Sequence, residues 1–203
     1  LLLTEDCCAG YDSNYKMNPP LRTERDIEAI RAGIKDGTIT VLATDHAPHT
    51  QEEKELEFAA APYGIIGLDC ALPLYVRALI DTGTIDWPDM LAMMTINSAK
   101  LVGLDARKGH LSPGADADVT IIDPKHAWTI DVNEFKSKSR NCPFHGWKVQ
   151  GRAVGTIVAG EYLPAALAPC TGIQVLPAAS MRRGPRTPPA YTPTVVLFRN
   201  TFM

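Results

Sequence analysis

Asp45, His46 and His49 fall close together in the sequence, directly after the short apolar and β-branched run at residues 40–44. A carboxylate beside two imidazoles can bind a metal ion or transfer protons in general acid–base catalysis. The alternative is that Asp45 caps the next helix and that both histidines lie on the surface. A carboxylate at the end of a buried strand needs a partner to offset its desolvation, which favours the chemical interpretation.

A second polar segment, Lys16–Arg22, contains the rigid pair Pro19-Pro20. The Asn18 side chain both donates and accepts hydrogen bonds and so suits the edge of a cyclic amide, whereas Arg22 suits a carboxylate. The structural alternative is a loop-to-helix connection in which Asn18 bonds the backbone and Arg22 forms an ion pair. In the loop Pro62–Gly67, paired glycines would let backbone amides approach a ligand, although a plain turn explains them equally well.

The elements that must position these residues follow from hydrophobic spacing. Thr23 as N-cap, Asp26 three positions later and isoleucines at helical intervals predict a helix from Thr23 to Gly37. Residues 40–44 then predict a buried strand, with the polar cluster at its carboxyl end. A helix, a buried strand and a loop with reactive side chains, in that order, are typical of the active face of a parallel α/β sheet or barrel. Further helices are predicted at residues 70–81, 88–95 and 98–102.

The sequence pattern changes after Leu104. Short β-rich pieces, separated by turns such as Asp123-Pro124, follow at residues 119–122, 128–130 and 152–158. They predict an all-β module from about residue 105 to 163. Residues 164–203 are rich in proline and arginine and hold no acidic residue, which predicts disorder. The charged run 52–58 and the remaining histidines show no ligand spacing and are interpreted as exposed or structural; they include Glu52, Glu53, Glu55, Glu57, His110, His126 and His145.

Composition limits the classes of function. The formal net charge is -3, and no Lys/Arg cluster precedes the last part of the chain, so nucleic-acid binding is not expected. No apolar run approaches the roughly 18 residues of a spanning helix, so a membrane protein is not expected. The 5 cysteines contain no C-x-x-C pair, which favours a reducing, cytoplasmic location over a disulfide framework or a thiolate zinc site. A small-molecule partner is the best expectation.

Three motifs, in this order, resemble the carboxyl half of a bacterial-type dihydroorotase of the amidohydrolase superfamily: Asn14–Arg22 (NYKMNPPLR), Ala43–His49 (ATDHAPH) and Ala61–Leu68 (APYGIIGL). Two later segments, Gly109–Asp118 and Asn141–Gly146, are similar to the start and the close of that superfamily's β-sandwich domain. The likeness covers about residues 1–163.

The resemblance implies an α/β fold in three parts. Residues 1–104 would form the C-terminal portion of a TIM (β/α)8 barrel, and residues 105–163 part of a small β-sandwich domain. The segment 164–203 would be a disordered tail. The family's paired His-x-His, its carboxylated lysine, two further metal histidines and a substrate-binding arginine would all precede Leu1. The chain is therefore expected to be truncated at its N-terminus, inactive by itself and without stoichiometric zinc.

The resemblance also implies roles for individual residues. Asp45 would be a zinc-bound carboxylate that serves as general base and acid. Asn18 and His49 would contact the substrate, and the backbone of Tyr63 and Gly64 would line its pyrimidine ring. The implied reaction is the reversible hydrolysis of dihydroorotate to N-carbamoyl-L-aspartate in de novo pyrimidine biosynthesis.

Two other functions stay open. One is another cyclic amidohydrolase, an allantoinase or a dihydropyrimidinase; Asn18 within Asn-Pro-Pro-Leu-Arg favours dihydroorotate. The other is a non-catalytic dihydroorotase-like subunit that scaffolds aspartate transcarbamoylase. The retention of Asp45, Asn18 and His49 argues against the scaffold, which has no need of them. Aspartate transcarbamoylase and a second copy of the chain, in a homodimer, are the macromolecular partners that the resemblance suggests.

Overall fold

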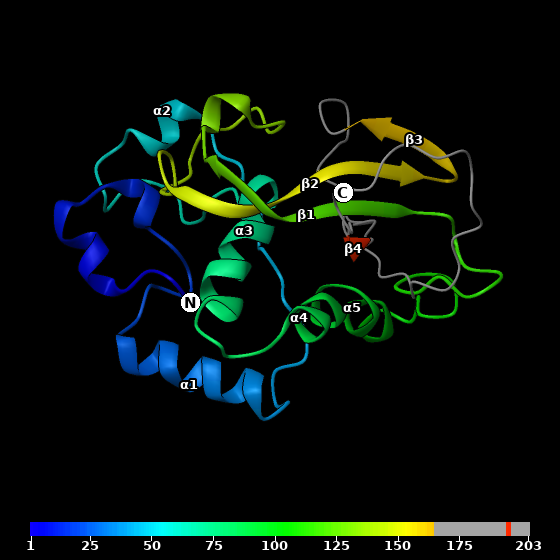
Figure 1. Cartoon of the computed structure of the whole chain (residues 1–203). Coiled ribbons are helices and arrows are strands. Elements are labelled where there is room, and N and C mark those ends of the chain that lie inside the picture. Colours follow the sequence, from blue (N-terminus) through cyan, green and yellow to red (C-terminus); the bar gives the residue numbers. More distant parts are fainter. Residues whose placement is uncertain (165–193, 196–203) are drawn as a thin grey trace. The chain divides into compact units, whose positions relative to one another are not determined.

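A computed structural model describes residues 1–164 and Thr194–Val195 (Figure 1). The chain divides into two compact units. The first comprises Leu1–Asp86 and Ala127–Gln150, and the second comprises Trp87–His126 and the described part of Gly151–Met203. All the residues predicted to bind substrate or transfer protons belong to the first unit.

The first unit is built mainly from short helices and irregular segments. Its α-helices are α1 (Glu24–Lys35), α2 (Gln51–Lys54) and α3 (Ala71–Tyr75). Its 3₁₀ turns are η1 (Glu5–Gly10), η2 (Ser13–Tyr15), η3 (Leu68–Cys70) and η5 (Val132–Glu134), and η4 (Val76–Ile80) is π-helical. The run of η3, α3 and η4 confirms the helix predicted at residues 70–81.

Helix α1 begins where the sequence predicts. Thr23 accepts from the Asp26 amide while the Asp26 carboxylate accepts from the Thr23 amide, so the two residues form a capping box. Ile27 and Ile34 are buried on the inner face of the helix. The predicted helix at Thr23–Gly37 is therefore confirmed.

The buried strand predicted at residues 40–44 is wrong. This segment is extended but has no β-ladder, and its residues are half-buried or exposed. A strand needs a neighbouring strand to pair its amides and carbonyls, and no strand in the described residues runs beside it. β-branched composition indicates extended backbone, but only a partner makes a sheet. The Tyr75 hydroxyl supplies one of the missing bonds by donating to the Ala43 carbonyl at 2.6 Å.

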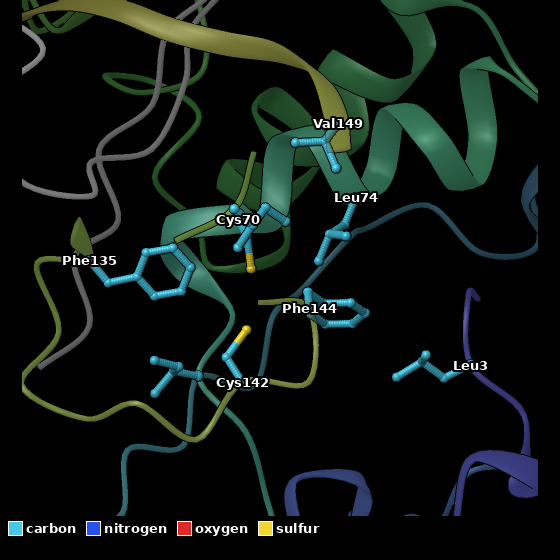
Figure 2. Packing of buried hydrophobic residues seen from close by; sticks show 9 residues of the cluster. Leu3, Cys70, Leu74, Phe135, Cys142, Phe144 and Val149 are labelled. Carbon is cyan, nitrogen blue, oxygen red and sulfur yellow. The ribbon is translucent and has the colours of Figure 1, made fainter. Parts of the chain in front are cut away.

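The core of the first unit joins segments from both ends of its sequence. Buried side chains from residues 66–74 pack with others from residues 130–149 (Figure 2). The cluster consists of Leu3, Ile66, Cys70, Leu74, Ile130, Phe135, Cys142, Phe144 and Val149. The sulfur atoms of Cys70 and Cys142 point toward each other in Figure 2, and both thiols are free. The neighbouring Cys142 side chain and burial raise the pKa of the Cys70 thiol, which therefore stays protonated.

One four-stranded sheet is described, with strand order β3-β2-β1-β4. Its strands are β1 (Val119–Thr129), β2 (Lys148–Val158), β3 (Glu161–Pro164) and β4 (Thr194–Val195). Strand β3 pairs antiparallel with β2, with Ile157 opposite Tyr162, and β4 pairs antiparallel with β1, with Ile121 opposite Val195.

The turn predicted at Asp123-Pro124 is also wrong, because β1 continues through it. Proline lacks the N–H that a ladder needs, so it is tolerated where no partner demands a donor. In the part of the chain that the structure describes, β4 reaches only Ile121 and Ile122. β4 therefore does not need the backbone N–H that Pro124 lacks.

In the second unit, helices α4 (Trp87–Met94) and α5 (Ile96–Leu101) confirm the helices predicted at 88–95 and 98–102 and pack against each other. The buried Asp118 carboxylate is satisfied by Lys108, 2.7 Å away, and by the Ala159 amide at 2.9 Å. Gly109 has φ 82°, and a Cβ there would lie 2.6 Å from the Ile96 Cα, so only glycine fits this approach.

Each unit is made of two separate stretches of the sequence. The division into domains between residues 104 and 105 stays a prediction about the family's architecture. The predicted disordered tail, residues 164–203, lies outside the described residues except for Pro164 in β3 and the two residues of β4. No helix within the described ranges is both long and apolar enough to cross a membrane.

Replacing Ile130 with alanine should destabilise the protein by about 2–5 kcal/mol, because the side chain is fully buried and its removal leaves a cavity. Urea denaturation measures this change. The matched control is Leu56→Ala, since Leu56 is 51% exposed and its loss should change stability by less than about 0.5 kcal/mol. Equal effects of the two substitutions would show that the cluster around Ile130 is not the core of this unit.

Candidate active site

Asp45 has an unusual backbone conformation for a residue with a side chain. Its φ is 44°, in the left-handed region, and the residue is exposed. Aspartate tolerates this region better than most residues, but the conformation still needs support from its surroundings. Strained residues of this kind cluster at functional sites, and the observation makes Asp45 a candidate on structural grounds as well.

The segment that carries Asp45 runs antiparallel to the loop after α2. The Ala47 amide donates to the Ile65 carbonyl at 2.9 Å, and the amides of Gly67 and Leu68 donate to His46 Nδ1 at 3.1 and 3.3 Å. Residues 43–49 and 63–68 are thus held side by side in a fixed register. We call these two segments the paired loops.

One ring nitrogen of His46 is used by this arrangement. Backbone amides can only donate, so Nδ1 must be the acceptor and the ring must be neutral at that nitrogen. Burial lowers the pKa of His46, which also favours the neutral ring, although the Asp69 carboxylate opposes this. The role of His46 is to hold the paired loops together, and the sequence cluster reduces to Asp45 and His49.

His49 lies at the other end of the paired loops. Its Nε2 is 2.9 Å from the Tyr63 carbonyl, and its Nδ1 is 3.7 Å from Glu53. A Cβ built on Gly64 would lie 3.7 Å from His49 Nε2 and 2.6 Å from the Ala47 Cβ. Gly64, with φ 110°, is therefore required by the close approach of Ala47. The structure brings His49, Tyr63 and Gly64 together.

Asn18 lies two residues after Lys16, which contacts this backbone. The Lys16 carbonyl accepts from the Gly64 amide at 2.9 Å. Consecutive Cα atoms are about 3.8 Å apart, so the Asn18 Cα lies within about 7.6 Å of the Lys16 Cα. Asn18 is exposed and the peptide bond to Pro19 is cis. Arg22, by contrast, shows the structural alternative: it is exposed and lies 3.6 Å from Asp26.

Asn141 is a site residue that sequence reasoning missed. It is 4% exposed, and its Nδ2 donates to the Ala47 carbonyl at 2.9 Å and to the Gly64 carbonyl at 3.2 Å. Its Oδ1 accepts from the His49 amide at 3.4 Å. One side chain thus ties both paired loops. The only signal in the sequence was its place in the Asn141–Gly146 motif, because nothing local reveals a partner more than 90 positions away.

Lys16 and Lys54 were missed as well, and the expectation that the whole run 52–58 is exposed is wrong at Lys54. Both lysines are 7% exposed. The short helix α2 turns Lys54 inward, where its ammonium finds backbone carbonyls, while the glutamates of the run stay at the surface. Periodicity gave no sign of this because α2 is a single turn.

The candidate site is an open surface. In the first unit a separate hollow of about 610 Å³ is lined by Arg77, Asp81 and residues 127–129 and 148–150. None of the predicted site residues lines it. Asp45 and Asn18 are instead exposed, and the Tyr63 side chain is 57% exposed.

A zinc ion needs more ligands than one carboxylate. Structural and catalytic zinc sites use at least three protein ligands. Within residues 1–164 and 194–195, no three His, Cys, Asp or Glu side chains gather in a way that would hold a metal ion. Asp45 offers one carboxylate, so these residues do not form a zinc site by themselves.

The family model and the similar sequences point to the same family. The family model described as "Amidohydrolase family" matches residues 11–163. Over 159 residues, the chain is 50% identical to a dihydroorotase from Geobacter sp. (strain M21) and 52% identical to one from Syntrophotalea carbinolica. Each match covers 78% of this chain and 37% of the relative. The chain thus spans little more than a third of the length of these curated relatives.

Solved structures with a similar fold are hydantoinases. The L-hydantoinase (dihydropyrimidinase) from Arthrobacter aurescens superimposes with a TM-score of 0.76 at 28% identity, over 82% of this chain and 38% of that one. The D-hydantoinase (dihydropyrimidinase) from Thermus sp. gives 0.67 at 29% identity, over 76% of this chain and 34% of that one.

Replacing Tyr75 with phenylalanine should remove a tyrosine whose pKa is strongly raised. Burial raises the pKa of Tyr75 to about 12. Between about pH 10 and 12 the folded state keeps a proton that the unfolded state releases, so stability falls as pH rises through this window. The variant should lose this alkaline step and, from the lost bond to Ala43, about 0.5–1.5 kcal/mol at neutral pH. Ultraviolet titration of tyrosinate and urea denaturation measure both. Tyr11→Phe, at a 75% exposed ring, is the control that should keep the step.

Replacing Asn141 with alanine should destabilise the protein by about 1–3 kcal/mol, because buried polar groups of the paired loops lose their partner. Amide exchange at Ala47 and His49 should accelerate together. Asn133 is exposed, and Asn133→Ala should leave both measurements close to those of the parent protein. Unchanged exchange in the Asn141 variant would contradict a shared tie between the loops.

Proposed function

The chain belongs to the amidohydrolase family, and from that membership we propose that the protein carrying it is a dihydroorotase. The reaction is reversible hydrolysis of the cyclic amide of dihydroorotate to N-carbamoyl-L-aspartate, in de novo pyrimidine biosynthesis. The observation that carries this proposal is the pair of hydrogen-bonded loops that contains Asp45, His49 and the Tyr63–Gly64 backbone. Identity of about 50% to curated dihydroorotases supports the choice of substrate.

Asp45 is the proposed proton carrier. Water adds across the amide C–N bond, so one proton must leave the attacking oxygen and another must reach the leaving nitrogen. A carboxylate next to the reacting atoms accepts the first and delivers the second. Asp45 is exposed in the first paired loop, and the amides of Gly67 and Leu68 donate to His46 and not to Asp45. His46 is the weaker candidate for this role because its Nδ1 already accepts two backbone amides.

The substrate-binding residues follow from the same surface. The Asn18 amide group is proposed to bind the polar edge of the ring, because it both donates and accepts. His49 is proposed to bind the substrate beside the Tyr63–Gly64 backbone, which lines the pyrimidine ring. The Gly64 amide donates to the Lys16 carbonyl, two residues before Asn18, which supports this assignment.

Zinc is the proposed cofactor, with Asp45 as the single ligand that this chain contributes. Bound zinc supplies Lewis-acid activation in such hydrolases. The described residues do not complete the site. We also propose that residues 1–104 are the C-terminal portion of the family's TIM barrel and that residues 105–163 are part of its β-sandwich domain.

A hydantoinase or dihydropyrimidinase is the second candidate, because solved structures with those names superimpose on this chain. Identity is the discriminating observation: it is 28–29% to these structures and 50–52% to the dihydroorotases. Dihydroorotate carries a carboxylate that dihydrouracil and hydantoin lack. Assay of the full-length protein on all three substrates separates the candidates, and preference for hydantoin or dihydrouracil would overturn the assignment. A scaffold for aspartate transcarbamoylase would hydrolyse none of them.

Replacing Asp45 with asparagine in the full-length protein should lower turnover by about 10²–10⁴-fold, because the amide cannot exchange the proton. Dihydroorotate hydrolysis measures the change. Asp105→Asn, at an exposed turn, is the matched control and should keep full turnover. A loss of less than about tenfold at Asp45 would show that another group carries the proton.

A further inference from the structure

Two buried ammonium groups hold the loop that ends at Gly64. Lys16 Nζ donates to the carbonyls of Ala59 and Ala61 at 2.8 and 2.6 Å. Lys54 Nζ donates to the carbonyls of Pro62 and Gly64 at 3.0 and 3.2 Å. Four of the six carbonyls in residues 59–64 are therefore bound by two side chains that come from different segments.

Supporting a loop with buried ammonium groups carries a large desolvation penalty. Burial lowers the pKa of Lys54, and the like charge of Lys16 lowers it further, while Asp12 partly compensates. Within residues 1–164, no carboxylate lies at ion-pair distance from either ammonium. Neutral donors would satisfy carbonyls with a smaller desolvation penalty. Charge-assisted bonds are shorter and roughly twice as strong, so the gain is a loop with less freedom.

Lys16 also constrains the aromatic ring beside the site. Its Nζ lies 4.6 Å from the centroid of the Tyr63 ring and 5.7 Å from that of Phe58. A cation over an aromatic face is attractive at these distances. The same residue accepts from the Gly64 amide through its own carbonyl. The backbone of Gly64 is consequently fixed at its amide by Lys16 and at its carbonyl by Lys54 and Asn141.

We propose that Lys16 and Lys54 are positioning residues whose ammonium groups fix the Tyr63–Gly64 backbone for contact with the substrate ring. This inference rests on the proposed function. Neither lysine is assigned contact with the reacting atoms. The Lys54 ammonium acts on the Gly64 carbonyl. The Lys16 ammonium acts on the carbonyls of Ala59 and Ala61 and on the Tyr63 ring. Displacement of a binding contact by about 1 Å is enough to weaken a site strongly.

The test compares Lys54→Met, which keeps the length of the side chain and removes the charge, with Lys54→Arg, which keeps the charge. Lys35→Met, at an exposed lysine of α1, is the matched control. Amide hydrogen exchange on the 203-residue chain is the first readout. Exchange at Gly64 should accelerate at least about tenfold in Lys54→Met, whereas amides of α1 should keep their rates. Lys54→Arg should fall between the Met variant and the parent protein.

Steady-state kinetics on the full-length protein is the second readout. Lys54→Met should raise KM for dihydroorotate at least about tenfold and change kcat by less than about threefold, because ring binding is lost in the ground and transition states alike. Lys54→Arg should recover part of the loss in KM. A fall in kcat without a rise in KM, or no recovery with arginine, would overturn the positioning role. If Lys54→Met fails to fold, Lys54→Gln replaces it, with the same expected directions.

The two readouts separate this inference from the proposed function. A folded full-length parent without dihydroorotase activity would overturn the proposed function, and the exchange experiment does not depend on activity. Gly64 exchange that is equal in Lys54→Met and Lys35→Met would overturn the inference itself. Accelerated exchange throughout the first unit would also overturn it, since Lys54 would then be a general stabiliser of the fold.

Discussion

A single main-chain hydrogen bond, from the Ala47 amide to the Ile65 carbonyl, sets the register of the paired loops. If either loop slipped by one residue, His46 would lose the amides of Gly67 and Leu68, and His49 would leave the Tyr63 carbonyl. The Ala47 side chain would also meet a residue with a Cβ in place of Gly64. Every contact that defines the candidate site therefore depends on this one alignment.

In the paired loops, side chains form the hydrogen bonds to the backbone that a neighbouring strand forms in a sheet. The paired loops carry many carbonyls and amides, and buried polar groups of the backbone must be satisfied. Asn141 and Lys54 supply donors to those carbonyls, and Lys16 donates to the carbonyls of Ala59 and Ala61 just before the second loop. Such a network is stiff when complete and costly when one member is missing. That property suits a surface whose function depends on backbone position.

The hydrophobic core anchors this polar network at two points. Ile66 lies within the second paired loop and is fully buried, and its amide donates to the Asn141 carbonyl at 3.1 Å. Cys142 follows Asn141 and points toward Cys70 (Figure 2). The residues that orient the site are thus the immediate neighbours of core residues. Packing of the core sets the position of Asn141, and the side-chain amide of Asn141 then holds the paired loops.

The sequence by itself predicted the longer helices and a set of candidate site residues. The capping box of α1 is a local pattern, because Thr23 and Asp26 lie within one turn, and the predicted helices near 70–81, 88–95 and 98–102 follow the same short-range spacing. The motif around Asp45 and His49 likewise needs only neighbouring residues. Tertiary structure decided what depends on distant partners. Residues 40–44 lack a neighbouring strand and form none, Lys54 turns inward to carbonyls, and Asn141 reaches residues more than 90 positions away. Composition and spacing record local preference, whereas pairing and burial depend on which segments the fold brings together.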